Sequence, residues 1–348
     1  MKEIVSQKIK NARALKGFSQ QELADLVGVS KQMISKYEKG ESIPSSSTLL
    51  KLGKSLNVKI DYFFKPSKIE LGVLNFRKKS SFSIKKQESL EQRIKLNLEN
   101  YLEIEELLQI DYSFPNIIGL ENIQNIDDIE RIVLLLRTEW EIGLDPIHNI
   151  IQLLEDKEIK VVELFDVDDT FDGVATFVND KFPVIVVNGN FPVERKRFTV
   201  LHELGHLLLN LPDCSLKDQE NYCNKFAAEF LFPKKLVLKE FGVKRDVISL
   251  NELIGVQEKY GISIQAIVHR LVDSGIFTDN KKIEFYKKLN FDPSLKKEVN
   301  LERFQTPEKS NRFEQLVYRA LSQEMISISK ASSLLNRNIN LLIENSLL

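Results

Sequence analysis

The residues with the clearest chemical potential form the segment His202-Glu203-Leu204-Gly205-His206, which is an HExxH motif. Two of the four histidines of the chain stand here, four positions apart around a glutamate. Positions i and i+4 of an α-helix lie one turn apart on the same face, so both imidazoles can bind one metal ion. Glu203 then lies beside that ion, where its carboxylate can accept a proton. The motif therefore predicts a metal site, provided that the segment is helical.

The residues around the motif predict the helix that this chemistry needs. Residues 198–210 place apolar side chains along one face of an amphipathic helix, which Pro192 and Glu194 open. Short β-branched runs separated by Asp and Gly residues precede it and predict a small sheet, with strands at 159–165, 174–178 and 184–188. Two helices are expected before this sheet, over 129–140 and 147–154. The motif helix is thus expected directly after a strand.

A zinc peptidase site also needs a third protein ligand and an open position for water. The next predicted helix, 218–233, offers two carboxylates, Glu220 and Glu229. Asn224 lies one turn after Glu220, so this pair can supply one metal ligand and one hydrogen-bond partner for a histidine. Glu229 lies among phenylalanines near the helix end. We therefore predict Glu220 as the third ligand, with Glu229 as the alternative.

These segments resemble the ImmA/IrrE family of zinc metallopeptidases. The matching stretches are VIVVN at 184–188, RFTVLHELGHLLL at 197–209 and E-x-x-x-N-x-F-A-A-E-F-L-F-P at 220–233. Family members often carry Glu-Ala-Asn where this chain has Tyr222-Cys223-Asn224, a departure that leaves Glu220 and Asn224 in place. The resemblance runs from about residue 130 to about residue 275. It implies Zn²⁺ as the cofactor and a regulator whose peptidase acts on a repressor or an antitoxin-like protein.

The ligand set predicts zinc endopeptidase chemistry. Zn²⁺ bound by His202, His206 and Glu220 would lower the pKa of its water to around 7 and polarise the peptide carbonyl. Glu203 would take the proton of that water and pass it to the leaving amine. Strand 184–188 is expected to hold an extended substrate by edge pairing.

Two alternatives use the same residues differently. In the first, the chain is a transcription factor or antitoxin whose zinc domain is a non-catalytic sensor or docking scaffold. In the second, the peptidase is primary and the N-terminal domain brings it to a DNA-bound substrate. The intact Glu203 favours the enzymatic alternatives, because a scaffold has no need of a general base.

A second chemical feature is the charge of residues 1–66, which contain 12 Lys and Arg but only 6 Asp and Glu. Their net charge is +6, and the rest of the chain carries −7 of the total of −1. A basic segment joined to an acidic body suggests that this segment alone meets nucleic acid.

The same segment predicts short helices separated by turn residues. Ser19 can cap a helix in which Glu22 completes a capping box. Ser30 can cap the next helix, 31–38, and Gly28 stands between the two. Two short helices joined by a tight glycine-containing turn form a helix-turn-helix.

Residues 18–58 resemble the lambda-repressor-like, xenobiotic-response-element type of helix-turn-helix. The matching positions are Gln20, Leu23, Ala24, Gly28, Ile34, Tyr37, Glu38 and Gly40. The resemblance implies that helix 31–38 enters the major groove of double-stranded operator DNA, and that the protein binds as a dimer. The side chains then expected at the DNA are Gln20, Lys31, Gln32 and Ser35 at base edges and Lys36 at phosphate. The alternative is a four-helix module that binds a protein, which the charge disfavours.

A length of 348 residues predicts two or three domains. We expect a helix-turn-helix domain over 1–66, a helical connector over 67–127 with a long helix at 84–108, a metallopeptidase domain over 128–277 and a C-terminal region over 278–348. The fold class is therefore multidomain. An all-α domain is followed by an α+β zincin-like domain and a mainly helical region of unassigned role.

The cysteines and the N-terminus bear on the cellular compartment. Cys214 and Cys223 make neither a disulfide framework nor a CxxC site, and they suit a reducing cytoplasm. The N-terminal residues lack the apolar core of a signal peptide, and no apolar run approaches the ~18 residues of a membrane span. We therefore expect a soluble cytoplasmic protein that has no membrane partner.

Overall fold

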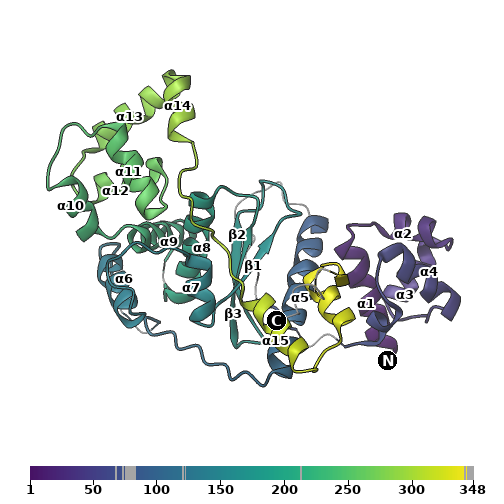
Figure 1. Ribbon diagram of the computed structural model, residues 1–348. Coiled ribbons are helices and arrows are strands. Elements are labelled where there is room, and N and C mark those ends of the chain that lie inside the picture. Colours follow the sequence, from purple (N-terminus) through teal and green to yellow (C-terminus); the bar gives the residue numbers. More distant parts are fainter. Residues whose placement is uncertain are drawn as a thin grey trace. The chain divides into compact units, whose positions relative to one another are not determined.

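The computed structural model (Figure 1) describes residues 1–66, 69–72, 74, 84–119, 121, 123–211, 214–340 and 342. The chain divides into two compact units. Unit 1 comprises Met1–Ile110 and Leu316–Leu348, and unit 2 comprises Asp111–Gln315. Residues 75–83 of the predicted connector lie outside the described residues. The first and the last helices of the chain therefore belong to the same unit.

Unit 1 begins with the predicted helix-turn-helix. Its elements are α1 (Lys2–Leu15), α2 (Gln20–Val27), α3 (Lys31–Glu38), α4 (Ser46–Leu56) and the 3₁₀-helix η1 (Ile60–Phe64). The hydroxyl of Ser19 accepts a hydrogen bond from the Glu22 N–H at 3.1 Å, and the Ser19 N–H donates to Glu22 Oε2 at 2.6 Å. Gly28 follows α2 with a φ of 78°, a conformation that favours glycine. The capping box and the turn are therefore confirmed.

A hydrophobic core fixes the orientation of α3. The core contains fully buried side chains from all the elements of this domain, which are Ile9, Ala12, Leu23, Ala24, Ile34, Leu52, Leu56 and Phe63. Ile34 and Tyr37 of α3 face this core, whereas Lys31, Gln32 and Lys36 are exposed. Because the two buried residues are three positions apart, they lie on one face of α3. The opposite face, including the first turn of the helix, is exposed to solvent.

The predicted connector helix is α5 (Ile84–Leu107), which packs against α1. Lys8 of α1 is buried, and its Nζ lies 3.5 Å from Glu99 Oε1 and 4.9 Å from the centre of the Tyr62 ring. Burial and the charge of Glu99 together raise the pKa of the Tyr62 hydroxyl. This cluster ties α5 to both ends of the helix-turn-helix domain.

Two helices from the end of the chain complete unit 1. They are α15 (Arg312–Ser322), of which the part from Leu316 lies in this unit, and α16 (Ile328–Leu335). Lys330 of α16 forms an ion pair with Glu103 of α5, with Nζ 2.8 Å from Oε2. The last part of the region without an assigned role, from Leu316, therefore belongs to the unit that contains the helix-turn-helix, whereas residues 278–315 belong to unit 2.

Unit 2 contains a three-stranded sheet in the order β1-β3-β2, with β1 (Lys160–Leu164), β2 (Gly173–Val178) and β3 (Phe182–Asn188). β3 pairs in parallel with β1 and antiparallel with β2. The expectation that strand 184–188 offers an edge to the substrate is therefore wrong. Both sides of this strand are already hydrogen-bonded, so an added peptide would find no backbone groups to pair with.

Helices cover this sheet and form the main core of unit 2. α7 (Ile150–Asp156) packs on β1, and α8 (Val193–Leu208) packs on β2 and β3. α9 (Leu216–Leu231) packs on α8, and α6 (Asp128–Glu139) packs on α9. α8 packs on β2, β3 and α9, and its side chains Leu201 and Leu204 are fully buried. The Trp140 ring, which follows α6, meets Phe230 of α9 edge-on at 5.8 Å. α8, which carries the HExxH motif, is thus a central element of the core.

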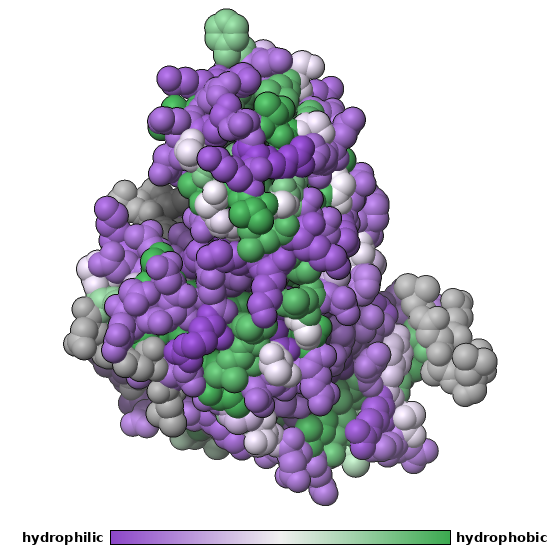
Figure 2. Space-filling view, turned by 90° about the vertical axis from the view of Figure 1, so that its left-hand side faces the viewer, coloured by the Kyte–Doolittle hydropathy of each residue, from purple (hydrophilic) through white to green (hydrophobic). Residues whose placement is uncertain are grey.

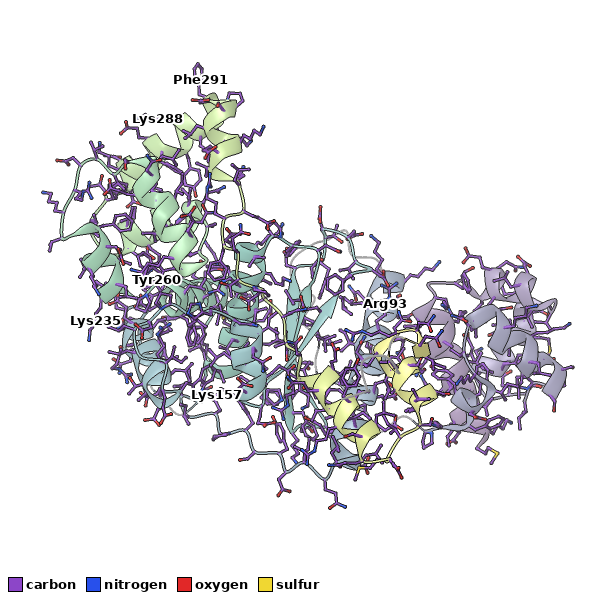
Figure 3. All side chains as sticks on the ribbon, in the orientation of Figure 1. Arg93, Lys157, Lys235, Tyr260, Lys288 and Phe291 are labelled. Carbon is purple, nitrogen blue, oxygen red and sulfur yellow. The ribbon has the colours of Figure 1, made fainter. Side chains whose placement is uncertain are left out.

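The remainder of unit 2 is helical, with α10 (Lys234–Phe241), α11 (Leu250–Tyr260), α12 (Ile264–Asp273), α13 (Asp279–Phe291) and α14 (Pro293–Val299). Arg270 of α12 is fully buried and donates to the carbonyl of Phe232 at 3.1 Å. Tyr260 is buried against Phe232, with ring centres 4.6 Å apart (Figure 3). The chain therefore combines a helical N-terminal domain, an α+β region and further helices, as the predicted fold class requires.

The surface of the molecule mixes residue types. Figure 2 shows hydrophobic side chains in separate patches among hydrophilic ones. The most exposed large hydrophobic side chain of unit 2 among the described residues is Phe291, which is 91% exposed and points outward at the end of α13 (Figure 3). Within the described part of the chain, no helix is both long enough and apolar enough to cross a membrane.

Residues 301–311 form a strap without helix or strand that binds the first half of α8. Glu194 Oε1 accepts a hydrogen bond from the N–H of Arg303 at 3.0 Å. Arg197 Nη1 lies 2.5 Å from Glu308 Oε2, and both side chains are fully buried. The N–H of Ile151 donates to the other carboxylate oxygen of Glu308 at 2.7 Å. Burial lowers the pKa of Arg197, and the negative charge of Glu308 opposes this shift. The ion pair between Arg197 and Glu308 joins the strap to α8.

Replacing Glu308 by Ala should destabilise unit 2, because it leaves the buried Arg197 guanidinium without its ion-pair partner. We expect a loss of about 3–5 kcal/mol in the free energy of unfolding. Urea unfolding followed by the fluorescence of Trp140, the single tryptophan of the chain, measures the change in the same unit. Glu302→Ala, which removes an exposed carboxylate of the same strap, is the control. Equal effects of the two substitutions would contradict the role of the pair.

Candidate metal centre

A close contact between α8 and α9 positions the candidate metal ligands. A Cβ atom built on Gly205 would lie 3.2 Å from both Cα and Sγ of Cys223. The missing side chain at Gly205 therefore lets the backbone of α9 approach α8 at the level of the HExxH motif. Glu220 lies one turn before Cys223 on α9, so this contact brings its carboxylate to the two histidines.

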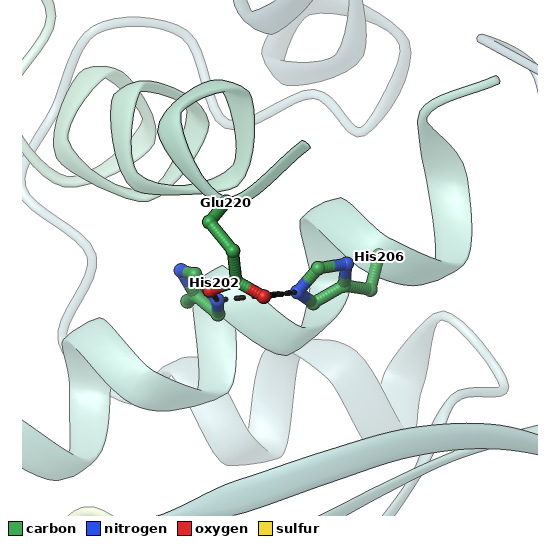
Figure 4. Close-up of side chains that lie close together, drawn as sticks. All are labelled: His202, His206 and Glu220. Atoms are coloured by element: carbon green, nitrogen blue, oxygen red, sulfur yellow. Dashed lines mark hydrogen bonds and ion pairs between the residues drawn. The ribbon is translucent and has the colours of Figure 1, made fainter. Parts of the chain in front are cut away.

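The three predicted ligands meet at one point (Figure 4). His202 Nε2 and His206 Nε2 are 3.2 Å apart, Glu220 Oε2 is 3.3 Å from the first, and Glu220 Oε1 is 3.4 Å from the second. A tetrahedral zinc ion with bonds of about 2.0–2.1 Å requires ligand atoms about 3.3 Å apart. Among the described residues, these are the one group of three His, Cys, Asp or Glu side chains whose possible ligand atoms all lie within 4.8 Å of one another. Its donor atoms and spacing fit a zinc ion.

The site is embedded but open on one side. The side chain of His202 is 9% exposed, whereas those of His206 and Glu220 are 21% and 17% exposed. A catalytic zinc site differs from a structural one in keeping a position for water or substrate. Two of the candidate ligands are partly exposed, and the described group contains three protein ligands. Both features are expected of a catalytic zinc site, in which a fourth position stays open.

Glu229, the alternative third ligand, is engaged elsewhere. Its carboxylate forms an ion pair with the buried Arg270 and accepts a hydrogen bond from the Lys234 N–H at 2.8 Å. It therefore caps the first turn of α10 and neutralises the guanidinium of α12. Of the two carboxylates considered from the sequence, Glu220 is the one that the fold brings to the histidines.

Asn224 does not occupy the place expected for the partner of a ligating histidine. Its side chain is exposed, and Cys223 Sγ instead lies 3.4 Å from Nδ1 of His206. Asn224 stands one position further around α9 than Cys223, a rotation of about 100°. Its side chain therefore turns away from the contact that Cys223 makes with α8. The sequence indicates Cys223 only as a thiol that suits a reducing compartment, and it does not predict this contact.

Glu203, the predicted proton acceptor, is buried where α8 meets the sheet. A Cβ atom built on Gly173, the first residue of β2, would lie 3.0 Å from Thr199 Cγ2 and Val186 O and 3.1 Å from Glu203 Cγ. The absence of a side chain at Gly173 therefore makes room for Glu203. A glycine inside a predicted helix, such as Gly205, is the available sequence signal for such a close approach. Gly173 stands just before the predicted strand 174–178 and gave no such signal.

The residues predicted to contact DNA lie on and beside α3. Lys31, Gln32 and Lys36 are exposed and Ser35 is partly buried. Ser30 caps the helix by accepting a hydrogen bond from the Met33 N–H at 3.2 Å. The exposed N-terminal turn of α3 thus carries a cation and an amide that can reach a nucleic acid.

Gln20 is joined to α3 through Glu38. Gln20 Nε2 donates to Glu38 Oε2 at 2.7 Å, and Arg13 Nε and Nη2 donate to the two oxygens of the same carboxylate at 2.5 and 3.1 Å. The amide of Gln20 is therefore held in one orientation at the start of α2. Gln20 at the start of α2 is thus linked to α3, the helix that carries the other residues predicted to contact DNA.

Comparison with known proteins finds one matching family model in each unit. The helix-turn-helix family model matches residues 9–63, and the model of the IrrE N-terminal-like domain matches residues 155–272. The prophage-derived uncharacterized HTH-type transcriptional regulator YonR of Bacillus subtilis is 41% identical over 59 residues, which are 17% of this chain and 55% of that protein. An uncharacterized transcriptional regulator in the ATPase CF(0) region of Rhodospirillum rubrum is 43% identical over 60 residues, which are 17% of this chain and 56% of that protein.

A shorter relative is matched over most of its length. The uncharacterized HTH-type transcriptional regulator YgzD of Bacillus subtilis is 39% identical over 57 residues, which are 16% of this chain and 86% of that protein. The other two relatives are matched over about half of their length. The similarity to all three is thus confined to a segment of the size of the helix-turn-helix domain.

The contact at Gly205 predicts the effect of adding a methyl group there. Gly205→Ala should push α9 away from α8 and weaken zinc binding about tenfold, in the range seen when the support of a metal ligand is removed. Competition with a chromophoric zinc chelator measures the affinity. Gly255→Ala is the matched control, because a Cβ atom on this glycine of α11 meets no atom within 4 Å. Unchanged affinity in Gly205→Ala would show that the close approach does not position Glu220.

Proposed function

We propose that this chain, which belongs to the HTH-type transcriptional regulators and also carries an IrrE N-terminal-like domain, is a DNA-binding regulator with a zinc-dependent endopeptidase. Residues 1–66 form the DNA-binding domain and residues 128–277 the peptidase domain. The protein acts in the cytoplasm on a repressor or an antitoxin-like protein. The observation that carries the peptidase is the group of three ligand residues whose donor atoms lie 3.2–3.4 Å apart, next in sequence to a buried glutamate.

The residues of unit 2 have separate roles in the proposed peptide hydrolysis. His202, His206 and Glu220 hold the zinc ion, which when bound lowers the pKa of a water molecule to about 7 and polarises the carbonyl of the substrate. The Glu203 carboxylate accepts the proton of the attacking water and delivers it to the amine that leaves. Because Glu203 is buried beside β2, packing limits the positions open to its side chain and keeps the proton acceptor near the ligands.

The substrate strand is best placed along β2. In the described sheet β2 has β3 as its one neighbour, so its other edge can pair with an extended peptide. Its first residue, Gly173, lies against Glu203. A peptide that pairs with this edge of β2 would therefore lie close to Glu203, the proposed proton acceptor.

The DNA-binding part of the proposal rests on α3. Its N-terminal turn exposes Lys31 and Gln32, which can contact base edges in the major groove. Lys36 lies one turn further along the helix, where it can neutralise a phosphate. Ser35 and the oriented amide of Gln20 complete the surface. The protein binds as a dimer to two half-sites of an operator.

Zinc content and cleavage together test the enzymatic part. We expect about one zinc ion per wild-type chain, the stoichiometry of a single three-ligand site, and its loss in His202→Ala. Glu203→Gln should retain the metal but abolish cleavage, because glutamine cannot accept the proton. New protein N-termini in cells that express wild type, compared with cells that express Glu203→Gln, identify the substrate.

Two results would contradict this assignment. Wild-type protein that takes up no zinc has no metallopeptidase site. Zinc binding without new N-termini, combined with a cellular phenotype that survives Glu203→Gln, would leave a non-catalytic sensor or docking scaffold.

Selection from random double-stranded DNA tests the regulator. The substitution of both Lys31 and Gln32 by Ala should weaken binding to the selected sequence by about 1–3 kcal/mol for each base that the protein then fails to read. Lys36→Ala should weaken the binding of all DNA sequences alike. It should also reduce the slope of log affinity against log salt concentration by about one. Lys54→Ala, which removes an exposed cation at the end of α4, is the control. Unchanged binding by the double variant would contradict the role of α3.

A further inference from the structure

Both ring nitrogens of His206 have neighbours, and both neighbours come from α9. Nε2 lies 3.4 Å from Glu220 Oε1, and Nδ1 lies 3.4 Å from Cys223 Sγ. Glu220 and Cys223 are three positions apart, so they stand on the same face of the helix, one turn from each other. The imidazole is thus held between two side chains of one helix turn.

The sulfur of Cys223 is fixed by packing. The residue is fully buried, and its Cα, Cβ and Sγ atoms all lie 3.2–3.3 Å from the position that a Cβ atom on Gly205 would take. Gly205 immediately precedes His206 on α8. This tight contact between the two helices therefore sets the distance from the sulfur to the imidazole.

The tautomer of His206 decides whether it can bind a metal through Nε2. A neutral imidazole carries one N–H, and a metal ion needs the lone pair of the other nitrogen. The Nε2 atom faces Glu220 and His202, so the proton must lie on Nδ1. A sulfur atom 3.4 Å away can accept the hydrogen bond of that N–H.

We infer that Cys223 is a positioning residue that orients His206 and stabilises its Nδ1–H tautomer for metal binding. The inference rests on the proposed zinc site, but it needs neither a substrate nor peptidase activity. Sulfur is a weaker acceptor than the oxygen that usually supports a ligating histidine. The expected contribution therefore lies at the low end of the range for such partners, about tenfold in zinc affinity.

Zinc competition with Cys223→Ala and Cys223→Ser tests this role. Alanine removes the acceptor and should weaken zinc binding about tenfold. Serine keeps a hydrogen-bond acceptor on the same Cβ atom and should bind zinc more tightly than the alanine variant. A role in packing alone predicts the opposite order, because a buried hydroxyl without a hydrogen-bond partner is less favourable than a methyl group. Cys214→Ala, which removes the other, half-buried thiol, is the control.

A second measurement reports on the imidazole itself. In zinc-loaded protein, nitrogen NMR of His206 should show a protonated Nδ1 in wild type and in Cys223→Ser, with slower proton exchange than in Cys223→Ala. Thermal unfolding followed at Trp140 shows that the variants remain folded. Equal zinc affinity and equal proton exchange in wild type and Cys223→Ala overturn the inference and leave the zinc site intact. Wild-type protein that binds no zinc overturns both.

Discussion

The close packing of α8 against α9 at Gly205 is the constraint on which the candidate site depends. A single missing side chain lets the two backbones approach until Cys223 almost touches α8. The same approach places Glu220 within 3.4 Å of both histidines and the Cys223 sulfur at Nδ1 of His206. Supports of this kind determine how well a metal ligand holds its geometry. The geometry of the candidate metal ligands and the packing of α8 against α9 therefore depend on the same contact.

α8 is fixed along its whole length, and each part is fixed in a different way. Its first turns are bound to the strap by Glu194 and by the buried pair of Arg197 and Glu308. Its second half is held by α9 and by the start of β2, where Gly173 makes room for Glu203. Buried charges are tolerated here because carboxylates and backbone carbonyls surround the Arg197 guanidinium. The helix can therefore keep two imidazoles and a carboxylate in place without rearrangement.

The two proposed activities lie in different units of the chain. The helix-turn-helix is in unit 1, together with α5, α16 and the part of α15 from Leu316, and the candidate metal centre is in unit 2. The chain passes between the units twice, after residue 110 and after residue 315. The second passage directly follows the strap that binds α8. Only a few residues of chain beyond Glu308 therefore join the strap that holds α8 to the part of the chain that belongs to unit 1.

The sequence by itself determined the features that depend on near neighbours. The spacing of HExxH, the capping box of Ser19 and the helix over 31–38 follow from contacts within about one helical turn, and all three are present. Tertiary structure alone decided which carboxylate meets the histidines, because Glu220 and Glu229 lie on one helix and differ in the partners brought by α8 and α12. It also placed β3 between β1 and β2 and brought Cys223 rather than Asn224 to His206. These outcomes depend on contacts between residues far apart in the chain, which local periodicity does not encode.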